Sequence, residues 1–356
     1  MTPGTRGKTN EPVTVAVINY NGMPGLDGTI RSIQALDYPE IRIWLIDDCS
    51  TDDSVSHVRS HFPDVRIHIM PENRRFLGKY PLANRVRNQA LELAETRLLF
   101  LADNDIVMAE DSLRVLVDTL DSLPDCAVCT PRILVREEPD TIYSDGTRLH
   151  YVCASESLNR EARHAGEKEP PKYSLGCGIQ LLEREKALEI GGMDEDYVVG
   201  WGDDGEFHHR MNMRGYRVYN VPQALVWHPR KAGGFRTVPQ VKNRWYFILE
   251  MYACRTLFFV WPALLVYDLF LFGFLTLKGG LKDYFISLWD VLIHLPKILK
   301  KRRRVQRLRV LRDRDLMEAC EIYVAPHVLN NPLLRLSMKF LNGFFRVYWA
   351  AVRRWV

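Results

Sequence analysis

Two segments of this chain have the pattern of a buried β-strand that stops at acidic residues. IRIWLIDD ends at Asp47 and Asp48, and RLLFLADND ends at Asp103, Asn104 and Asp105. Segments with helical spacing separate them, and strands that alternate with helices predict a doubly wound, mainly parallel α/β sheet. Ligands bind such sheets at the carboxyl ends of the strands. We therefore expect both acidic clusters to face one crevice.

The remaining strands of the predicted sheet lie on either side of these two. VTVAVINYNG starts the sheet, contains Asn19 and ends in a turn at Asn21, and further strands are expected at VRIHIM, CAVCTPRILV, YSLGCGIQLL and YRVYNVP. Residues 140–173 are charged and rich in proline, which predicts a mobile surface loop. Cys126 and Cys129 fall within one predicted strand, where alternation sends residues three apart to opposite faces.

The second acidic cluster has the spacing of a metal site. Asp103 and Asp105 alternate along the chain and so point the same way. Hard cations such as Mg²⁺ take oxygen ligands, commonly one or two carboxylates together with substrate phosphates. Asp47 and Asp48 either cap the following helix or accept hydrogen bonds from a nucleotide. This arrangement predicts a nucleotide-sugar site with a divalent metal, Mg²⁺ or Mn²⁺.

A third acidic cluster stands at a predicted helix start, in GWGDDGEF. Asp203 and Asp204 either cap the helix or supply the general base that a sugar hydroxyl needs. The helix dipole favours the ionised carboxylate there. Trp201 is positioned to stack on a sugar ring, and Glu206 adds a further acid for the acceptor.

His228 follows the apolar run ALVW. A lone histidine in that context is either a hydrogen-bonded core residue or, because a loop begins immediately after it, a metal ligand. Both interpretations stay open on the sequence alone.

Taken together, the segments VINYNG, LIDDCS, FLADND, GGMDEDYVVGWGDDGEFHHR and GYRVYNVPQALVWH resemble the family 2 glycosyltransferases of GT-A fold over roughly residues 12–230. The resemblance implies that Asp47 contacts the base or ribose of the donor. It implies that Asp105 and Asp103 belong to the metal-diphosphate motif, that Asp204 is the catalytic base, and that His228 reaches the metal.

The sequence departs from the family pattern in two places. Asp203 replaces the more usual glutamate, and the Gly-Trp-Gly turn is similar to that of some galactosyltransferases, which leaves the donor sugar open. Processive members carry QxxRW, whereas here Gln240 and Arg244 have one residue too many between them. A bacterial, non-processive, inverting enzyme is therefore expected, with residues 231–243 as a candidate lid.

The composition changes near residue 244. Residues 256–277 are apolar over the length that a membrane span needs, but Pro262 and Asp268 argue against a simple span. The run KILKKRRRVQRLRVLR contains no acid, and the last residues form a basic amphipathic helix. These features predict helices that lie on an anionic membrane surface, and they make nucleic acid an unsuitable partner.

These observations predict a flexible tail over residues 1–11, a catalytic domain over 12–243 and a membrane-associated helical region over 244–356. Residues 1–12 lack the apolar core of a secretory signal, so the expected location is the cytoplasmic face of the inner membrane. A lipid-linked, polyprenyl-type acceptor in cell-surface polysaccharide synthesis fits that location, and a homodimer stays open.

Two other classes compete with this hypothesis. A sugar-phosphate nucleotidyltransferase needs its Gly-rich phosphate loop after the first strand, but here PGTRG precedes that strand. A non-catalytic scaffold of the same fold would bind membrane and partners without chemistry.

Overall fold

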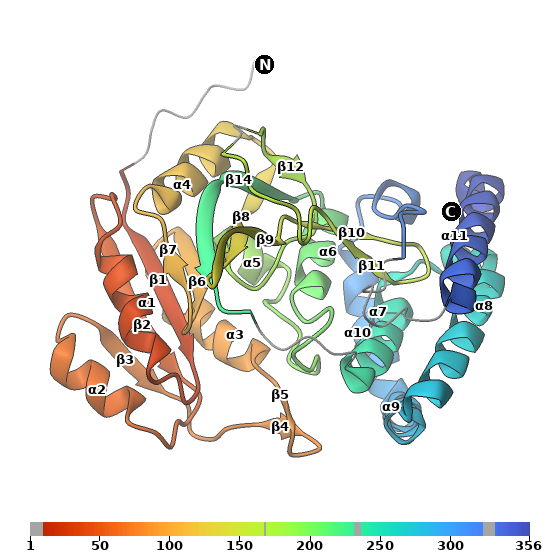
Figure 1. The fold of residues 1–356 in the computed structure, drawn as a ribbon, viewed down its shortest axis with the longest axis horizontal. Helices are drawn as coiled ribbons and strands as arrows, with labels where there is room; N and C mark the ends of the chain where they lie inside the picture. The colour runs from red at the N-terminus through yellow and green to blue at the C-terminus, as the bar shows by residue number, and fades with distance from the viewer. Residues whose placement is uncertain (1–9, 167–168, 231–235, 323–331) are drawn as a thin grey trace.

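The computed structural model describes residues 10–166, 169–230, 236–322 and 332–356. A central sheet lies in the amino-terminal two thirds of the chain, and the helices of the carboxyl-terminal third gather beside it (Figure 1). Its strands lie in the order β12-β14-β8-β13-β6-β1-β2-β3, with β7 paired to β14 and β9 to β8. Their bounds are β1 Val13–Asn19, β2 Ile41–Asp47, β3 Arg66–Ile69, β6 Leu98–Asp103, β7 Val107–Met108, β8 Cys126–Val135, β9 Glu138–Ser144, β12 Lys172–Tyr173, β13 Gln180–Glu183 and β14 Arg217–His228.

The predicted parallel sheet is confirmed for the half that carries the acidic clusters. Strand β1 pairs in parallel with β2 and β6, and β2 pairs in parallel with β3. Strand β13, however, is inserted antiparallel between β6 and β8, so the sheet as a whole is mixed. Strand β14 pairs in parallel with β8 and extends to His228, which is its last residue.

Helices cover both faces of the sheet, because alternate residues of the strands are apolar on both sides. Val13, Val15 and Val17 pack with α1 and α4, whereas Ala16 packs with α3 and α6. These residues are buried to 0% exposure, as expected for central strands. The helices are α1 Gly25–Gln34, α2 Ser54–His61, α3 Asn84–Leu93, α4 Ser112–Ser122, α5 Arg184–Glu189 and α6 Gly205–Arg214.

The carboxyl-terminal helices share a core with the predicted catalytic part. Tyr151, Val152 and Cys153 are fully buried in the same cluster as residues of α7 to α11. The elements are α7 Arg244–Met251, α8 Cys254–Lys278, α9 Leu281–Ile293, α10 Leu295–Arg307 and α11 Pro332–Val352, with short 3₁₀ turns at Asp313–Asp315 and Arg353–Trp355. The predicted tail falls largely on residues 1–9, outside the described residues.

The acid in the middle of the apolar helix α8 has a buried partner. Asp268 accepts a hydrogen bond from Arg244 Nη1 at 2.8 Å, and the Arg244 side chain is only 2% exposed. Arg244 Nε also donates to the carbonyl of Val152 at 3.0 Å. The charge of Asp268 is therefore turned towards the protein, away from the outer surface of the helix.

The spacing between Gln240 and Arg244, one residue longer than in QxxRW, coincides with a π-helical turn. Pro239–Asn243 form a π-helical turn that leads directly into α7. A π-turn accommodates one additional residue within a helix. The residue that this chain has in addition to the QxxRW spacing therefore lies in the π-helical turn before Arg244.

Two predictions of local structure are wrong. Residues 140–173 are not a surface loop throughout, because they contain most of β9 as well as β10 (Thr147–Leu149) and β11 (Ser155–Ser157). Cys126 and Cys129 do not point to opposite faces, since their Sγ atoms lie 3.4 Å apart. A break in the register beside Cys126, where β14 pairs with β8, disrupts the regular alternation there. Two small additional strands, β4 (Arg75–Phe76) and β5 (Tyr80–Pro81), pair with each other.

Candidate active site

Hydrogen bonds join the ends of three parallel strands at one edge of the sheet. Asn19, the last residue of β1, donates from Nδ2 to Asp47 Oδ2 at 2.7 Å. Its Oδ1 accepts a hydrogen bond from Asn104 Nδ2 at 2.7 Å. Asp47 also accepts from the backbone and the hydroxyl of Ser50. The structure therefore brings the first two acidic clusters to a common edge.

Three potential metal ligands meet at this edge. Ligand atoms of Asp103, Asp105 and His228 all lie within 4.8 Å of one another. His228 Nε2 lies 3.3 Å from Asp105 Oδ1 and 3.8 Å from Asp103 Oδ2. Asp103 ends β6 and His228 ends β14, so two strands position the group.

The chemistry of this group fits a divalent cation. The Nδ1 atom of His228 lies 2.6 Å from the carbonyl of Pro229, and donation of its proton there leaves Nε2 as a lone-pair ligand. The ring also stacks on Tyr143, with centroids 5.6 Å apart. Two carboxylates and one imidazole can hold Mg²⁺ or Mn²⁺, with the remaining positions for substrate oxygens.

The predicted catalytic pair has two different environments. Asp203 accepts a hydrogen bond from Arg87 Nη1 at 3.1 Å and another from the backbone of Gly200. Asp204 caps α6 by accepting a hydrogen bond from the backbone of Gly205 at 2.8 Å, and its side chain stays partly exposed. Asp203 is thus held by the protein, whereas Asp204 has capacity to accept a proton.

The surroundings of Asp204 change its acidity. Burial, and next the negative charge of Asp203, raise the pKa of the Asp204 carboxyl to about 7. The positive charge of Arg87 acts in the opposite direction. A carboxylate with a pKa near neutral is suited to general-base catalysis.

Arg87 is a site residue that the sequence analysis missed. Burial alone lowers the pKa of this guanidinium, but the charges of Asp203, Asp103 and Asp204 outweigh burial and raise it. Arg87 therefore lies in the field of both the metal group and the catalytic pair. The sequence did contain an indication of this role. Arg87 lies on the same buried face of α3 as Ala90 and Leu91, and a charged residue on a buried face needs a partner.

Arg136 is a second basic residue that was missed. It lies at the metal group, where Nη2 donates to the backbone carbonyl of Asp105 and its backbone amide donates to the carbonyl of His228. No sequence pattern marked it, since it simply follows the long strand β8.

The other predicted donor residues lie beside Asp47. Asn21 has a positive φ of 48° and uses its Oδ1 to accept from the backbone of Thr51. Asp48 accepts from Asn73 Nδ2 at 2.6 Å, and burial raises the pKa of its carboxyl to about 6 against the positive charge of Arg85. Both residues belong to the strand-end loops that border the crevice.

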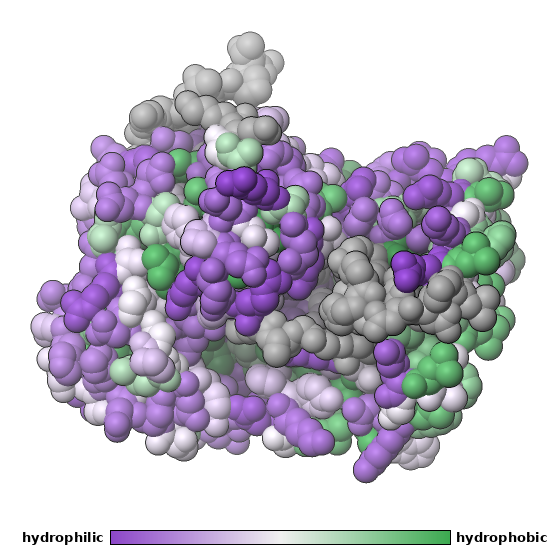
Figure 2. All heavy atoms as spheres, viewed as in Figure 1, coloured by the Kyte–Doolittle hydropathy of each residue, from purple (hydrophilic) through white to green (hydrophobic). Residues whose placement is uncertain are grey.

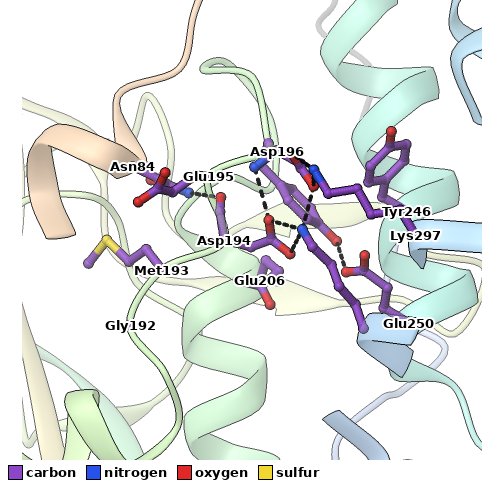
Figure 3. Close-up of polar contacts among 12 residues, drawn as sticks. Asn84, Gly192, Met193, Asp194, Glu195, Asp196, Glu206, Tyr246, Glu250 and Lys297 are labelled. Carbon is purple, nitrogen blue, oxygen red and sulfur yellow. Dashed lines mark hydrogen bonds and ion pairs between the residues drawn. The ribbon is translucent and has the colours of Figure 1, made fainter. Parts of the chain in front are cut away.

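The two predicted acceptor residues differ in solvent exposure. Trp201 is partly exposed on the loop before α6, and its indole donates to Ser155 Oγ at 3.2 Å. Glu206 is 1% exposed, and Arg210 holds both of its carboxylate oxygens. Glu206 points into a second acidic group with Asp194 and Glu250 (Figure 3). The acceptor contact of Glu206 stays a prediction, and it would require this ion pair with Arg210 to open.

Comparison with known proteins identifies the class. Residues 14–189 match the sequence profile of glycosyl transferase family 2, and residues 156–231 match the N-terminal domain of galactosyltransferase. The chain belongs to glycosyltransferase family 2. Membership argues against the sugar-phosphate nucleotidyltransferase alternative, whereas a non-catalytic scaffold of the same fold would carry the same family profile.

Individual relatives are distant. Poly-beta-1,6-N-acetyl-D-glucosamine synthase of Staphylococcus aureus (strain COL) is 21% identical over 230 residues, which cover 63% of this chain and 52% of that protein. The chain thus spans about half the length of the curated relatives that it matches. The crystal structure of GalNAc-T7 with UDP, GalNAc and Mn²⁺ superposes with a TM-score of 0.56 at 17% identity, covering 71% of this chain and 50% of that one. This likeness confirms the GT-A fold.

The metal group predicts how donor binding depends on Mn²⁺. Asp105→Ala should remove a charged ligand and weaken Mn²⁺-dependent binding of a nucleoside diphosphate by roughly 10- to 100-fold, the range for loss of a residue that supports a metal. His228→Ala should have a smaller effect, because it removes a neutral ligand. Isothermal titration with UDP and GDP, with and without EDTA, measures this. The matched control is Asp111→Ala, an exposed acid eight residues beyond Asp103. Equal affinity of Asp105→Ala and the unaltered chain in Mn²⁺ would contradict the assignment.

Proposed function

We propose that this glycosyltransferase moves one sugar from a nucleotide-sugar donor to a lipid-linked, polyprenyl-type saccharide acceptor, with inversion, at the cytoplasmic face of the inner membrane. The proposed process is cell-surface polysaccharide synthesis. One observation carries the chemistry: Arg87 lies within the electrostatic reach of Asp103, Asp203 and Asp204 together. A metal group and a carboxylate of near-neutral pKa thereby share one edge of the sheet.

The chemistry follows from this juxtaposition. Asp204 takes the proton of an acceptor hydroxyl, whose oxygen forms the new bond to the anomeric carbon of the donor sugar. The bond from that carbon to the diphosphate breaks, and the electron pair leaves with the diphosphate. A single displacement of this kind inverts the anomeric carbon. A divalent cation held by Asp103, Asp105 and His228 would supply positive charge for the departing diphosphate.

Asp203 acts in this proposal through its neighbours. Its ion pair with Arg87 fixes the start of α6, and its negative charge keeps the pKa of Asp204 high. It is therefore a positioning residue, and Asp204 is the base.

The remaining strand-end residues are proposed to bind the donor. Asn19, Asn21, Asp47 and Asp48 would contact the base or ribose, because they border the crevice at the ends of β1 and β2. GalNAc-T7 was solved with UDP and Mn²⁺, which supports a nucleotide bound with a metal. Trp201 would contact the acceptor, since it precedes the base on the same loop.

Non-processive transfer is proposed because the spacing before Arg244 departs from QxxRW. The candidate lid falls partly on residues 231–235, outside the described residues.

Replacing the base should separate transfer from donor binding. Asp204→Asn keeps the size and the helix cap but removes the proton acceptor. Transfer should fall by the ~10²- to 10⁴-fold typical of general-base loss, with nucleotide affinity unchanged. Asp203→Asn is the matched variant one residue away and should retain more activity. Full activity in Asp204→Asn together with its loss in Asp203→Asn would show that the roles are reversed.

The pKa of Asp204 also predicts a pH profile. Because the base must be deprotonated, kcat/KM should fall as the pH drops through about 7, the raised pKa of Asp204 in the free enzyme. Asp203→Asn removes a charge that raises this pKa, so the midpoint should move to lower pH. Arg87→Gln removes a charge that lowers it, so the midpoint should move to higher pH. Shifts of both variants in the same direction would contradict this electrostatic account.

A further inference from the structure

Helix α8 has an exposed apolar stripe along its whole length. The exposed residues recur every three or four positions, which places them on one side of the helix: Phe258, Trp261, Leu265, Leu269 and Phe272. The opposite side is buried against the protein, for example at Val260, Leu264 and Leu271. At 25 residues the helix is about 37 Å long. Soluble proteins rarely expose a contiguous apolar stripe of this length to water.

Neighbouring helices extend the stripe into a continuous surface. Helix α9 exposes Phe285, Trp289, Leu292 and Ile293, and α11 exposes Leu336, Phe340, Phe344 and Val347. The ring centroids of Phe272 and Phe285 lie 6.3 Å apart, and those of Phe259 and Trp355 lie 6.2 Å apart. Hydrophobic residues gather over these helices at the right-hand edge of the molecule (Figure 2). We name these exposed residues of α8, α9 and α11 the apolar face.

Positive charge is concentrated in the same part of the chain. Residues 244–356 contain 19 Lys and Arg against 8 Asp and Glu, a net charge of +11, whereas residues 1–243 contain 29 against 36, a net charge of −7. On α10, Lys300, Arg303, Arg304 and Arg307 are exposed at helical spacing, and within the described residues none forms an ion pair. We name these four the basic stripe. Arg302 is not part of it, because it donates to the carbonyl of Leu249 at 2.7 Å.

We propose that the apolar face and the basic stripe form one docking surface for an anionic lipid bilayer, and that α8 lies within a single leaflet. Exposed Trp and Phe of α8, α9 and α11, together with Lys and Arg of α10 that form no ion pair within the described residues, match the boundary between acyl chains and headgroup phosphates. A protein partner would need acidic residues around an apolar centre, whereas a bilayer provides both features over a surface of any extent. Among the described residues, α8 is the one helix that is long and apolar enough to cross a membrane.

The contacts of Asp268 argue against a crossing. Asp268, at the middle of α8, is bound to Arg244, and Arg244 is bound to the carbonyl of Val152 in the catalytic part. A crossing helix would carry this segment to the centre of the bilayer, where irregular backbone is not tolerated against lipid. A helix that lies in the interface keeps Asp268 and its partners on the protein side.

The docking surface is rigidly attached to the catalytic part. Lys301 of α10 binds Asp194 and Asp196. Lys297 of the same helix binds Asp196 at 2.7 Å (Figure 3). Tyr197 donates to Glu250 of α7 at 3.3 Å. These ion pairs fix how the crevice faces the bilayer. The proposal that this surface binds a bilayer does not depend on the transfer chemistry. It rests on the proposed function only in one respect, that the acceptor is a lipid in the same membrane.

Binding of the full chain to sealed vesicles tests the docking surface. Co-sedimentation with vesicles of phosphatidylcholine and phosphatidylglycerol should be strong, and should weaken with pure phosphatidylcholine or high salt. Lys300→Gln, Arg303→Gln and Arg307→Gln together should weaken binding roughly 100-fold, at about fivefold per charge near the surface. Gln at Arg59, Lys79 and Arg163, three exposed basic residues of the catalytic part, is the matched control.

The apolar face has its own variant. Trp261→Gln, Leu269→Gln and Trp289→Gln together should weaken binding at least tenfold, whereas Gln at Ile69, Tyr173 and Leu188, exposed residues elsewhere, should leave it unchanged. Hydrolysis of the nucleotide sugar should be unaffected in every variant, which separates a failure of docking from a failure of the enzyme. Equal losses in the test and control variants would overturn the docking surface.

Thiol labelling decides between one leaflet and a crossing. In a Cys254→Ser background, Arg255→Cys and Lys278→Cys place a thiol at either end of α8, where both native residues are exposed. With protein added to the outside of sealed vesicles, a membrane-impermeant maleimide should label both positions. Protection of one end and labelling of the other would show that α8 crosses, and the one-leaflet inference would be wrong.

Discussion

Carboxylates crowd at one edge of the central sheet, and the buried guanidinium of Arg87 is the interaction that allows them to stay there. Asp103, Asp203 and Asp204 all act on it. Like charges in a poorly solvated place repel one another and take up protons. Arg87 pairs directly with Asp203, whereas burial, and next the charge of Asp203, raise the pKa of Asp204 to about 7. The two adjacent carboxyls thus differ in environment, which is the basis for proposing Asp203 as the positioning residue and Asp204 as the base.

Two neighbouring residues at the start of α7 contact both the loop before Asp204 and the proposed docking helices. Asn243 donates to the backbone carbonyls of Val198 and Trp201, and so holds the loop that leads to Asp204. The next residue, Arg244, binds Asp268 in the middle of α8. Asn243 and Arg244 therefore connect the loop before Asp204, where the acceptor is proposed to bind, to the proposed membrane surface. The proposed lipid-linked acceptor would reach the proposed base, Asp204, along this short path.

The sequence predicted those features that depend on local pattern. The strands ending at Asp47 and Asp103, the helix after Asp204 and the end of that helix at Gly215 all follow from periodicity and capping. The sequence alone could not predict features that depend on contacts between residues distant in the chain. The antiparallel insertion of β13, the engagement of Glu206 by Arg210 and the partners of Arg87 arise from packing. The contact of Cys126 with Cys129 arises from irregular strand pairing, which residue alternation does not record.

The location of the bound metal tests the central claim most directly. Among the described residues, two groups of side chains could hold a metal ion: Asp103 with Asp105 and His228, and Asp194 with Glu206 and Glu250. Lys301 and Arg210 already supply positive charge to the second group. Anomalous diffraction at the manganese edge, from crystals grown with Mn²⁺ and UDP, should show one strong peak between Asp105 and His228 next to the diphosphate. A peak only within the second group, or UDP bound with no metal peak, would contradict the account.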